Sequence, residues 1–168
     1  MIILERDCDV GGVWRDNRYP GCACDVESHL YSMSFAPNPN WSTVFAKQPE
    51  IYDYLKHCAE KFNLLQLIRF QHNVQRMDWD ATNGVWIIQT NKGEFRARMV
   101  IGAFGALSDP NIPHLKGIEE FKGKAFHSAN WPSRLDLKDK RIAVVGTGAS
   151  AIQFIPEIQP QVKQLYVF

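Results

Sequence analysis

The sequence predicts an α/β fold, and its C-terminal part gives the clearest support. Arg141 to Val145 is an apolar run that is typical of a buried strand. A turn with two glycines begins at Gly146, and residues 149–158 have the pattern of a helix. A further apolar strand begins at Leu165. The order strand, turn, helix, strand is the opening of a doubly wound unit with a parallel sheet.

The N-terminal part begins with a short apolar strand, residues 2–4, which ends at Glu5. Residues 7–46 are rich in Gly, Pro, Asn and Ser and have no clear periodicity, so we expect an ordered loop region held by its many aromatic side chains. A helix is expected over residues 49–63. Apolar residues recur there at helical spacing, namely Ile51, Tyr54, Leu55, Cys58 and Phe62.

The middle of the chain predicts three strands. Arg69 to Asp80 and Val85 to Thr90 flank Asn83-Gly84, which is a strong hairpin signal. Glu94 to Ala103 is expected to form the third strand, and its apolar end, Val100 to Ala103, resembles a buried parallel strand. Residues 105–118 contain two prolines and two glycines and predict a connecting loop.

Composition narrows the classes of function. The chain has 168 residues, of which 45% are hydrophobic and 22% charged, and its net charge is +1. This near balance argues against binding to nucleic acid or to a membrane surface. No apolar run approaches the roughly 18 residues that cross a bilayer, and no basic region of a signal peptide precedes the first strand. We therefore expect a cytoplasmic protein without a membrane span.

The four cysteines do not predict a metal site. Cys22 and Cys24 are the only close pair, and Cys-x-Cys without a second pair does not complete a zinc ligand set. We expect reduced thiols and no metal.

The turn Gly146-x-Gly148-x-x-Ala151 predicts a dinucleotide site. It follows a predicted strand and opens a predicted helix, which is the context that this pattern requires. Gly146 permits the tight turn, Gly148 permits close approach of a pyrophosphate, and Ala151 permits close packing of helix and strand. The helix N-terminus supplies free N–H groups for phosphate, and Ser150 adds a hydroxyl. The alternative is a glycine-rich turn without a ligand. The residue that selects NAD or NADP lies roughly 20 residues beyond the turn, near Phe168, so the choice stays open.

A second half-site is indicated near the N-terminus. A carboxylate that ends a strand, such as Glu5, binds ribose hydroxyls in dinucleotide-binding units. A solvated strand end is the alternative for Glu5 alone. Gly11-Gly12-Val13-Trp14 favours the ligand interpretation, because the glycines allow close approach and the tryptophan can cover a flat ring.

Several motifs together resemble one known group. Near the N-terminus they are Gly11-Gly12-Val13-Trp14, Asn17-Arg18-Tyr19-Pro20-Gly21, Cys24-Asp25-Val26-Glu27-Ser28, Tyr31 and Ser34-Phe35. These resemble the flavin region of Baeyer–Villiger monooxygenases. Phe121-x-Gly123-x-x-x-His127-x-x-x-Trp131-Pro132 matches the fingerprint of that family at every defined position. The resemblance spans essentially the whole chain, but only the N-terminal third or so of a typical family member.

The resemblance implies an enzyme with two dinucleotide-binding domains, one for FAD and one for NADPH. Such an enzyme uses O2 to convert a small ketone to an ester or lactone. Glu5 would bind the adenosine ribose of FAD, and Val74 the adenine. Residues along the FAD would be Val13, Trp14, Asp25 and Tyr31. Ala23, Cys24 and Asp25 would face the NADP side. The NADP pyrophosphate would be held by Gly146, Thr147, Gly148, Ala149, Ser150, Ala151, Ile152 and Gln153.

Two residues are the candidates for catalysis under this resemblance. Asp25 resembles the carboxylate that orients an active-site arginine beside the flavin. His127 is either a general base or a structural histidine at a domain junction, and the resemblance favours the structural role. Trp131 and Phe121 are expected to be packing residues.

The resemblance also divides the chain. Residues 1–107 would be a partial FAD-binding domain without its first strand and glycine-rich turn, residues 108–138 a linker with the fingerprint, and residues 139–168 the start of an NADP-binding domain. The expected fold is a partial, Rossmann-like two-dinucleotide-binding-domain α/β fold that is truncated at both ends. The chain alone is expected to be inactive without the remainder of its parent chain. Ala103-Phe104-Gly105 departs from the Ala-Thr-Gly common in the family.

Two other functions remain open. A related N- or S-oxidising flavin monooxygenase shares the two turns but lacks the full fingerprint, and a product assay with a ketone and an amine separates the two. A non-catalytic truncated remnant is the other alternative.

Overall fold

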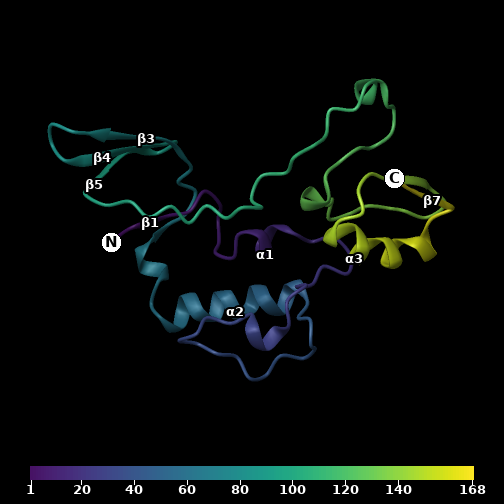
Figure 1. Cartoon of the computed structure of the whole chain (residues 1–168), viewed down its shortest axis with the longest axis horizontal. Helices are drawn as coiled ribbons and strands as arrows, with labels where there is room; N and C mark the ends of the chain where they lie inside the picture. The colour runs from purple at the N-terminus through teal and green to yellow at the C-terminus, as the bar shows by residue number, and fades with distance from the viewer. The chain divides into compact units, whose positions relative to one another are not determined.

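The computed structural model describes residues 1–168 as a mixed α/β structure with three separate sheets. The chain forms two compact units. Figure 1 draws the whole chain coloured by residue number. Unit 1 comprises residues 1–11 and 55–106, and unit 2 comprises residues 12–54 and 107–168.

Unit 1 contains two small sheets. β1 (Ile3–Leu4) pairs in parallel with β2 (Ile68–Arg69). β3 (Val74–Asp80), β4 (Val85–Thr90) and β5 (Gly93–Ala97) form an antiparallel meander in that order. The predicted hairpin is confirmed, and its turn is closed by the Gly84 N–H, which donates to the carbonyl of Asp80 at 2.9 Å. The short helix η2 (Leu65–Leu67) precedes β2.

Two strand predictions in unit 1 are wrong in extent. The strand expected at 69–80 is interrupted between β2 and β3, where the backbone of Gln71 and His72 bonds to Asp7 and Glu5 instead of to a sheet. The third strand ends at Ala97, and the apolar end expected to be a buried parallel strand is not a strand. Ile101 is 90% exposed. A strand is stabilised by a hydrogen-bonded neighbour, and no strand pairs with this segment.

Helix α2 (Gln48–Lys61) confirms the predicted amphipathic helix. Ile51 is only 1% exposed, as its place on the apolar face predicts. Within unit 2, Tyr54 fastens the preceding loop, because its hydroxyl donates to the Ala36 carbonyl at 2.8 Å and accepts from the Met33 N–H at 2.7 Å. The long region of residues 7–46 is therefore an ordered loop, interrupted only by short helices α1 (Val13–Asp16) and η1 (Ser28–Leu30).

The C-terminal part of unit 2 is the predicted strand–helix–strand unit. β6 (Arg141–Val144) and β7 (Gln164–Val167) pair in parallel, and α3 (Ala149–Ile158) connects them before the short helix η5 (Gln159–Gln161). Upstream lie η3 (Ile118–Glu120) and η4 (Ser128–Asn130). The core of this unit consists of Tyr19, Cys22, Leu137, Val144, Ala151, Phe154 and Ile158.

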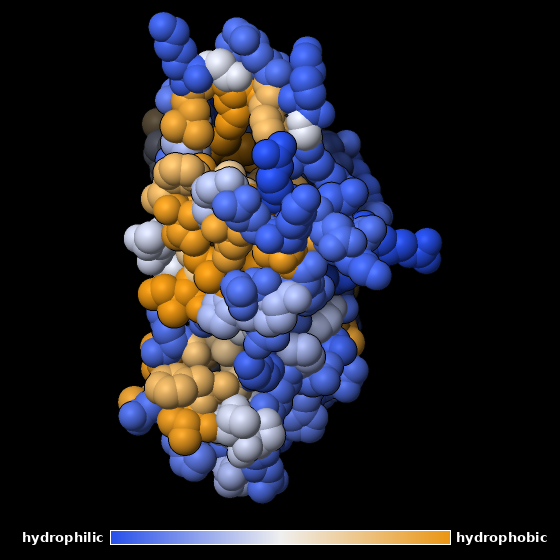
Figure 2. Space-filling model, turned by 90° about the vertical axis from the view of Figure 1, so that its right-hand side faces the viewer, coloured by the Kyte–Doolittle hydropathy of each residue, from blue (hydrophilic) through white to orange (hydrophobic).

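The expectation that Arg141–Val145 is buried is wrong for most of its residues. Val144 is buried, but Val145 is 59% exposed. Because this sheet has two strands and packs through Val144 against α3, the rest of β6 lacks cover. Figure 2 shows apolar patches among hydrophilic side chains on the face it draws. No helix in the chain combines the length and apolar character needed to span a membrane.

Candidate functional site

The turn between β6 and α3 leaves the N-terminus of α3 without a side-chain cap. Gly146 has φ 108°, a conformation that favours glycine, and its N–H donates to the Phe168 carbonyl at 2.9 Å, which joins the turn to the end of β7. Gly148 is the N-cap residue of α3, and no side chain caps the helix there. A Cβ atom added at Gly146 or at Gly148 would meet no atom within 4 Å. The space beside the turn is therefore open.

This open helix end suits an anion. The first N–H groups of a helix have no partners inside the helix, and its dipole gives this end partial positive charge. A phosphate approaching the turn would meet these donors without displacing a side chain. Ala151 is 6% exposed and packs in the core, which fixes the first turn of α3 against β6. Among the predicted pyrophosphate ligands, Thr147, Ala149 and Ile152 are exposed and Ser150 is half-buried.

Gln153 is placed differently from the rest of the turn. Its Oε1 accepts from the Ala23 N–H at 3.2 Å and from the Tyr19 hydroxyl at 3.0 Å, and its Nε2 donates to the Ala23 carbonyl at 2.9 Å. The structure thus brings Ala23 to α3 from 130 residues away, while the side chain of Gln153 faces the protein.

The segment that follows Ala23 is partly buried. Cys24 is 4% exposed, its N–H donates to the Ala46 carbonyl at 2.9 Å, and Asp25 is exposed. Burial raises the pKa of the Cys22 and Cys24 thiols. Burial also raises the pKa of Tyr19 to about 12. These three groups are therefore neutral near pH 7.

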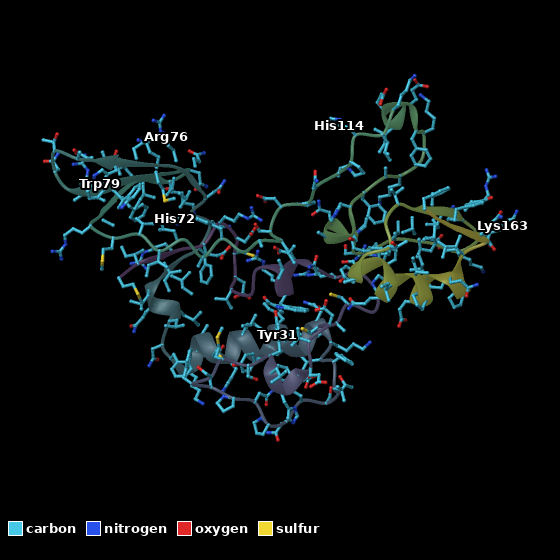
Figure 3. All side chains as sticks on the ribbon, in the orientation of Figure 1. Tyr31, His72, Arg76, Trp79, His114 and Lys163 are labelled. Carbon is cyan, nitrogen blue, oxygen red and sulfur yellow. The ribbon has the colours of Figure 1, made fainter.

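Trp14 and Tyr31 form a fixed aromatic pair in unit 2. The indole N–H of Trp14 donates to the Tyr31 hydroxyl at 3.0 Å, and the rings meet edge to face with centroids 5.6 Å apart. Figure 3 labels Tyr31. The Gln48 side-chain amide donates to the backbone carbonyl of Trp14, which secures α1. The resemblance predicts that both aromatic residues lie along the FAD, but the sequence does not predict their direct contact.

Arg15 was not among the predicted site residues. It is 5% exposed, and its guanidinium makes a bidentate ion pair with Asp16, with nitrogen–oxygen distances of 2.7 and 2.9 Å. No local pattern in the sequence indicates that Arg15 is buried.

The fingerprint residues have different surroundings. His127 precedes η4, and its Nδ1 accepts from the Ala129 N–H at 3.1 Å. Trp131 packs between Phe126 and Phe154, at centroid distances of 5.3 and 5.2 Å. Trp131 therefore packs as expected. Phe121 is 62% exposed and is therefore not a packing residue of the core. Its ring lies instead against Gly123, where a Cβ atom would stand.

Glu5 and Val74 are the predicted site residues of unit 1. The Glu5 carboxylate accepts from the Asp7 N–H at 2.9 Å, and its backbone bonds to Arg69 and His72. Val74 opens β3 and pairs with Thr90. Both side chains are half-buried in this unit.

No group of three His, Cys, Asp or Glu side chains in residues 1–168 is arranged to hold a metal ion. All four cysteines are free thiols.

Comparison with known proteins gives consistent matches over the whole chain. The model of the family described as flavin-binding monooxygenase-like matches residues 2–168. The chain is 52% identical, over its full length, to a Baeyer-Villiger monooxygenase of Streptomyces coelicolor, and 49% identical to one of Pseudomonas aeruginosa. It covers 32% of each relative, so the chain spans about a third of the length of the curated relatives it matches.

Solved structures also match almost the whole chain. The chain is similar to a complex of OTEMO with FAD and NADP, with a TM-score of 0.92 and 36% identity, over 99% of this chain and 34% of that one. It is also similar to an oxidised steroid monooxygenase bound to NADP, with a TM-score of 0.88 and 44% identity, over 99% of this chain and 33% of that one. These matches confirm the resemblance that the fingerprint and the N-terminal motifs indicate.

Proposed function

This chain belongs to the flavin-binding monooxygenase-like family, and from that membership we propose that it forms the NADP-binding turn and part of the FAD site of a Baeyer–Villiger monooxygenase. The reaction we propose for the whole enzyme is the conversion of a small ketone to an ester or lactone with NADPH and O2. The observation that carries the proposal is the open Gly146–Ala151 turn at the N-terminus of α3.

The NADP side rests on the geometry of this turn. We propose that the N–H groups at the start of α3 hold the pyrophosphate, with the Ser150 hydroxyl as an additional donor. We expect the turn to accept a phosphate without rearrangement, because a Cβ atom added at Gly146 or at Gly148 would meet no atom within 4 Å. Binding there would place the dinucleotide beside the end of β7.

For FAD we propose residues in each unit separately. In unit 2, the Trp14–Tyr31 pair offers a rigid aromatic wall, since the indole hydrogen bond fixes both rings. We propose that Val13 and Asp25 join this wall. In unit 1, we propose Glu5 for the ribose hydroxyls and Val74 for the adenine.

When bound, the flavin supplies the electron transfer and oxygen chemistry, while the protein supplies binding and orientation. The Asp25 side chain is exposed. We propose that it positions an arginine, because a carboxylate fixes a guanidinium through two parallel hydrogen bonds. His127 uses Nδ1 within the chain, which supports a structural role rather than that of a general base.

The ketone assignment is supported by the complete fingerprint and by the names of the two bacterial relatives. The division into an FAD-binding part at residues 1–107, a linker at 108–138 and an NADP-binding part at 139–168 stays part of this proposal.

A chimera tests the proposed reaction. Residues 1–168 would replace the matching segment of the Streptomyces coelicolor relative, to which they are 52% identical. We expect a yellow protein that oxidises NADPH and converts a ketone to an ester, detected by mass spectrometry. The same chimera with Gly148→Ala should keep its flavin colour but oxidise NADPH more slowly. A folded, yellow chimera that oxidises an amine or a sulfide and leaves every ketone unchanged would contradict the assignment.

A further inference from the structure

We propose that Gln153 is a positioning residue that locks α3 to the segment Tyr19–Asp25, and that this lock couples nucleotide bound at the Gly146 turn to the position of Asp25. The inference rests on the proposed function for its nucleotide, but the lock itself is a property of unit 2 alone.

The side-chain amide of Gln153 is committed to the chain. An amide offers two acceptor sites and two donor hydrogens. Both acceptor sites are used by Ala23 N–H and the Tyr19 hydroxyl, and one donor is used by the Ala23 carbonyl. Only one donor hydrogen remains. The Gln153 side chain is therefore poorly suited to hold a pyrophosphate. The backbone N–H groups at the Gly146 turn are better suited.

On the other side of this contact, Gly21 lets its backbone lie close to α3. Gly21 has φ 76°, and a Cβ atom there would lie 2.7 Å from the Gln153 carbonyl oxygen and 2.9 Å from Cγ of Glu157. The backbone of the segment thus lies directly against α3. Tyr19 is buried beside Phe154, with ring centroids 6.1 Å apart. Contacts from Tyr19, Gly21 and Ala23 therefore fix the segment at three points.

Within unit 2, this arrangement connects the Gly146 turn to Asp25. The Gly146 turn begins α3, and Gln153 lies within the same rigid helix. Ala23 is held by Gln153, and Asp25 follows two residues later, with the buried Cys24 between them. A shift of α3 on nucleotide binding would therefore move Ala23, and Asp25 with it.

The first test of the lock needs no nucleotide. Hydrogen exchange of the Ala23 amide would be measured by NMR in the whole chain and in Gln153→Leu, which keeps the size but not the polar atoms. We expect the Ala23 amide to be protected in the wild-type chain and to exchange about tenfold faster in the variant. Gly21→Ala breaks the same contact from the other side and should give the same change. Gln161→Leu is the matched control, because Gln161 also donates to a backbone carbonyl on this helix but is exposed. An unprotected Ala23 amide in the wild-type chain would overturn the lock.

The second test adds NADP⁺ and follows the amide signals of Gly146–Ala151 and of Ala23–Asp25. In the wild-type chain both sets should shift with the same midpoint. In Gln153→Leu the turn signals should still shift, with Kd within about twofold, while the signals of Ala23–Asp25 no longer respond. A loss of affinity of about tenfold or more in the folded variant would show instead that Gln153 contacts the nucleotide, and would overturn the positioning role. If NADP⁺ shifts no signal in the wild-type chain, the proposed nucleotide site and the coupling both fail, whereas the exchange of Ala23 still decides the lock.

Discussion

Trp131 packs against Phe154 in a tilted arrangement, with a centroid distance of 5.2 Å and an angle of 54° between the ring planes. Trp131 belongs to the fingerprint segment, and Phe154 lies on the buried face of α3. The fingerprint tryptophan is therefore a packing residue for the helix that begins at the proposed nucleotide site. Its effect on that site comes through the position of α3.

Trp131→Ala should destabilise unit 2 by about 2 kcal/mol, since the change removes a large half-buried ring from an aromatic cluster. Phe121→Ala is the matched control, because Phe121 is in the same fingerprint but is 62% exposed. Its effect should stay within about 0.5 kcal/mol. Urea denaturation, followed by circular dichroism, measures both. Equal losses in the two variants would contradict the packing role of Trp131.

His127 should act as a helix cap. His127→Ala should cost about 1 kcal/mol of unfolding free energy, because the Ala129 N–H then loses its acceptor. His127→Asn should recover most of that loss, since asparagine is among the preferred N-cap residues. His114→Ala, at an exposed position labelled in Figure 3, serves as the control. If Asn restores nothing, the histidine ring stabilises the segment in some other way.

The stability of unit 2 should depend on Tyr19 at alkaline pH. Burial raises the pKa of Tyr19 from 10.0 to about 12 in the folded chain. Below pH 10 the phenol is protonated in both the folded and the unfolded chain, so its contribution is complete. Between pH 10 and about 12 the unfolded chain ionises first, and stability falls by about 1.4 kcal/mol per pH unit.

Urea denaturation of the wild-type chain and of Tyr19→Phe at pH 9 and pH 11 would isolate this effect. The wild-type chain should lose more stability than the variant, by about 1 kcal/mol. Tyr166→Phe is the control, because Tyr166 is 43% exposed. If the wild-type chain and Tyr19→Phe respond identically to pH, Tyr19 does not titrate as its burial requires.

Local signals in the sequence predict the local elements well. β4 matches its predicted residues, and α3 its expected span, because a hairpin turn and a glycine turn mark where these elements begin. Val100–Ala103 was predicted wrongly because an apolar run indicates burial but not a partner. Without a hydrogen-bonded neighbour, these residues form no strand, and residues 101–103 are exposed.

In the candidate site, too, local features are predictable from the sequence and contacts between distant residues are not. The Gly146 turn is predictable, since its chemistry lies within six successive residues. The contact between Gln153 and Ala23 joins residues that are 130 positions apart, and no local pattern contains it. The motif alone therefore assigns Gln153 to the pyrophosphate, whereas the structure turns its side chain toward Tyr19 and Ala23.

Gly148 offers the most direct test of the nucleotide site. Its φ is −73°, and an added Cβ atom would meet nothing within 4 Å, so Gly148→Ala should fold as the wild-type chain does. That methyl group would nevertheless occupy the space in which a pyrophosphate approaches the backbone. Gly146→Ala is less suitable, because φ at Gly146 is 108° and any side chain there is strained.

The decisive measurement is a calorimetric titration of NADP⁺ into the wild-type chain and into Gly148→Ala, at equal salt concentration and with folding verified by circular dichroism. We predict saturable binding by the wild-type chain and a Kd about tenfold or more higher in the variant. Absence of saturable binding by the wild-type chain, or equal Kd values in the two proteins, would contradict a dinucleotide site at the Gly146 turn.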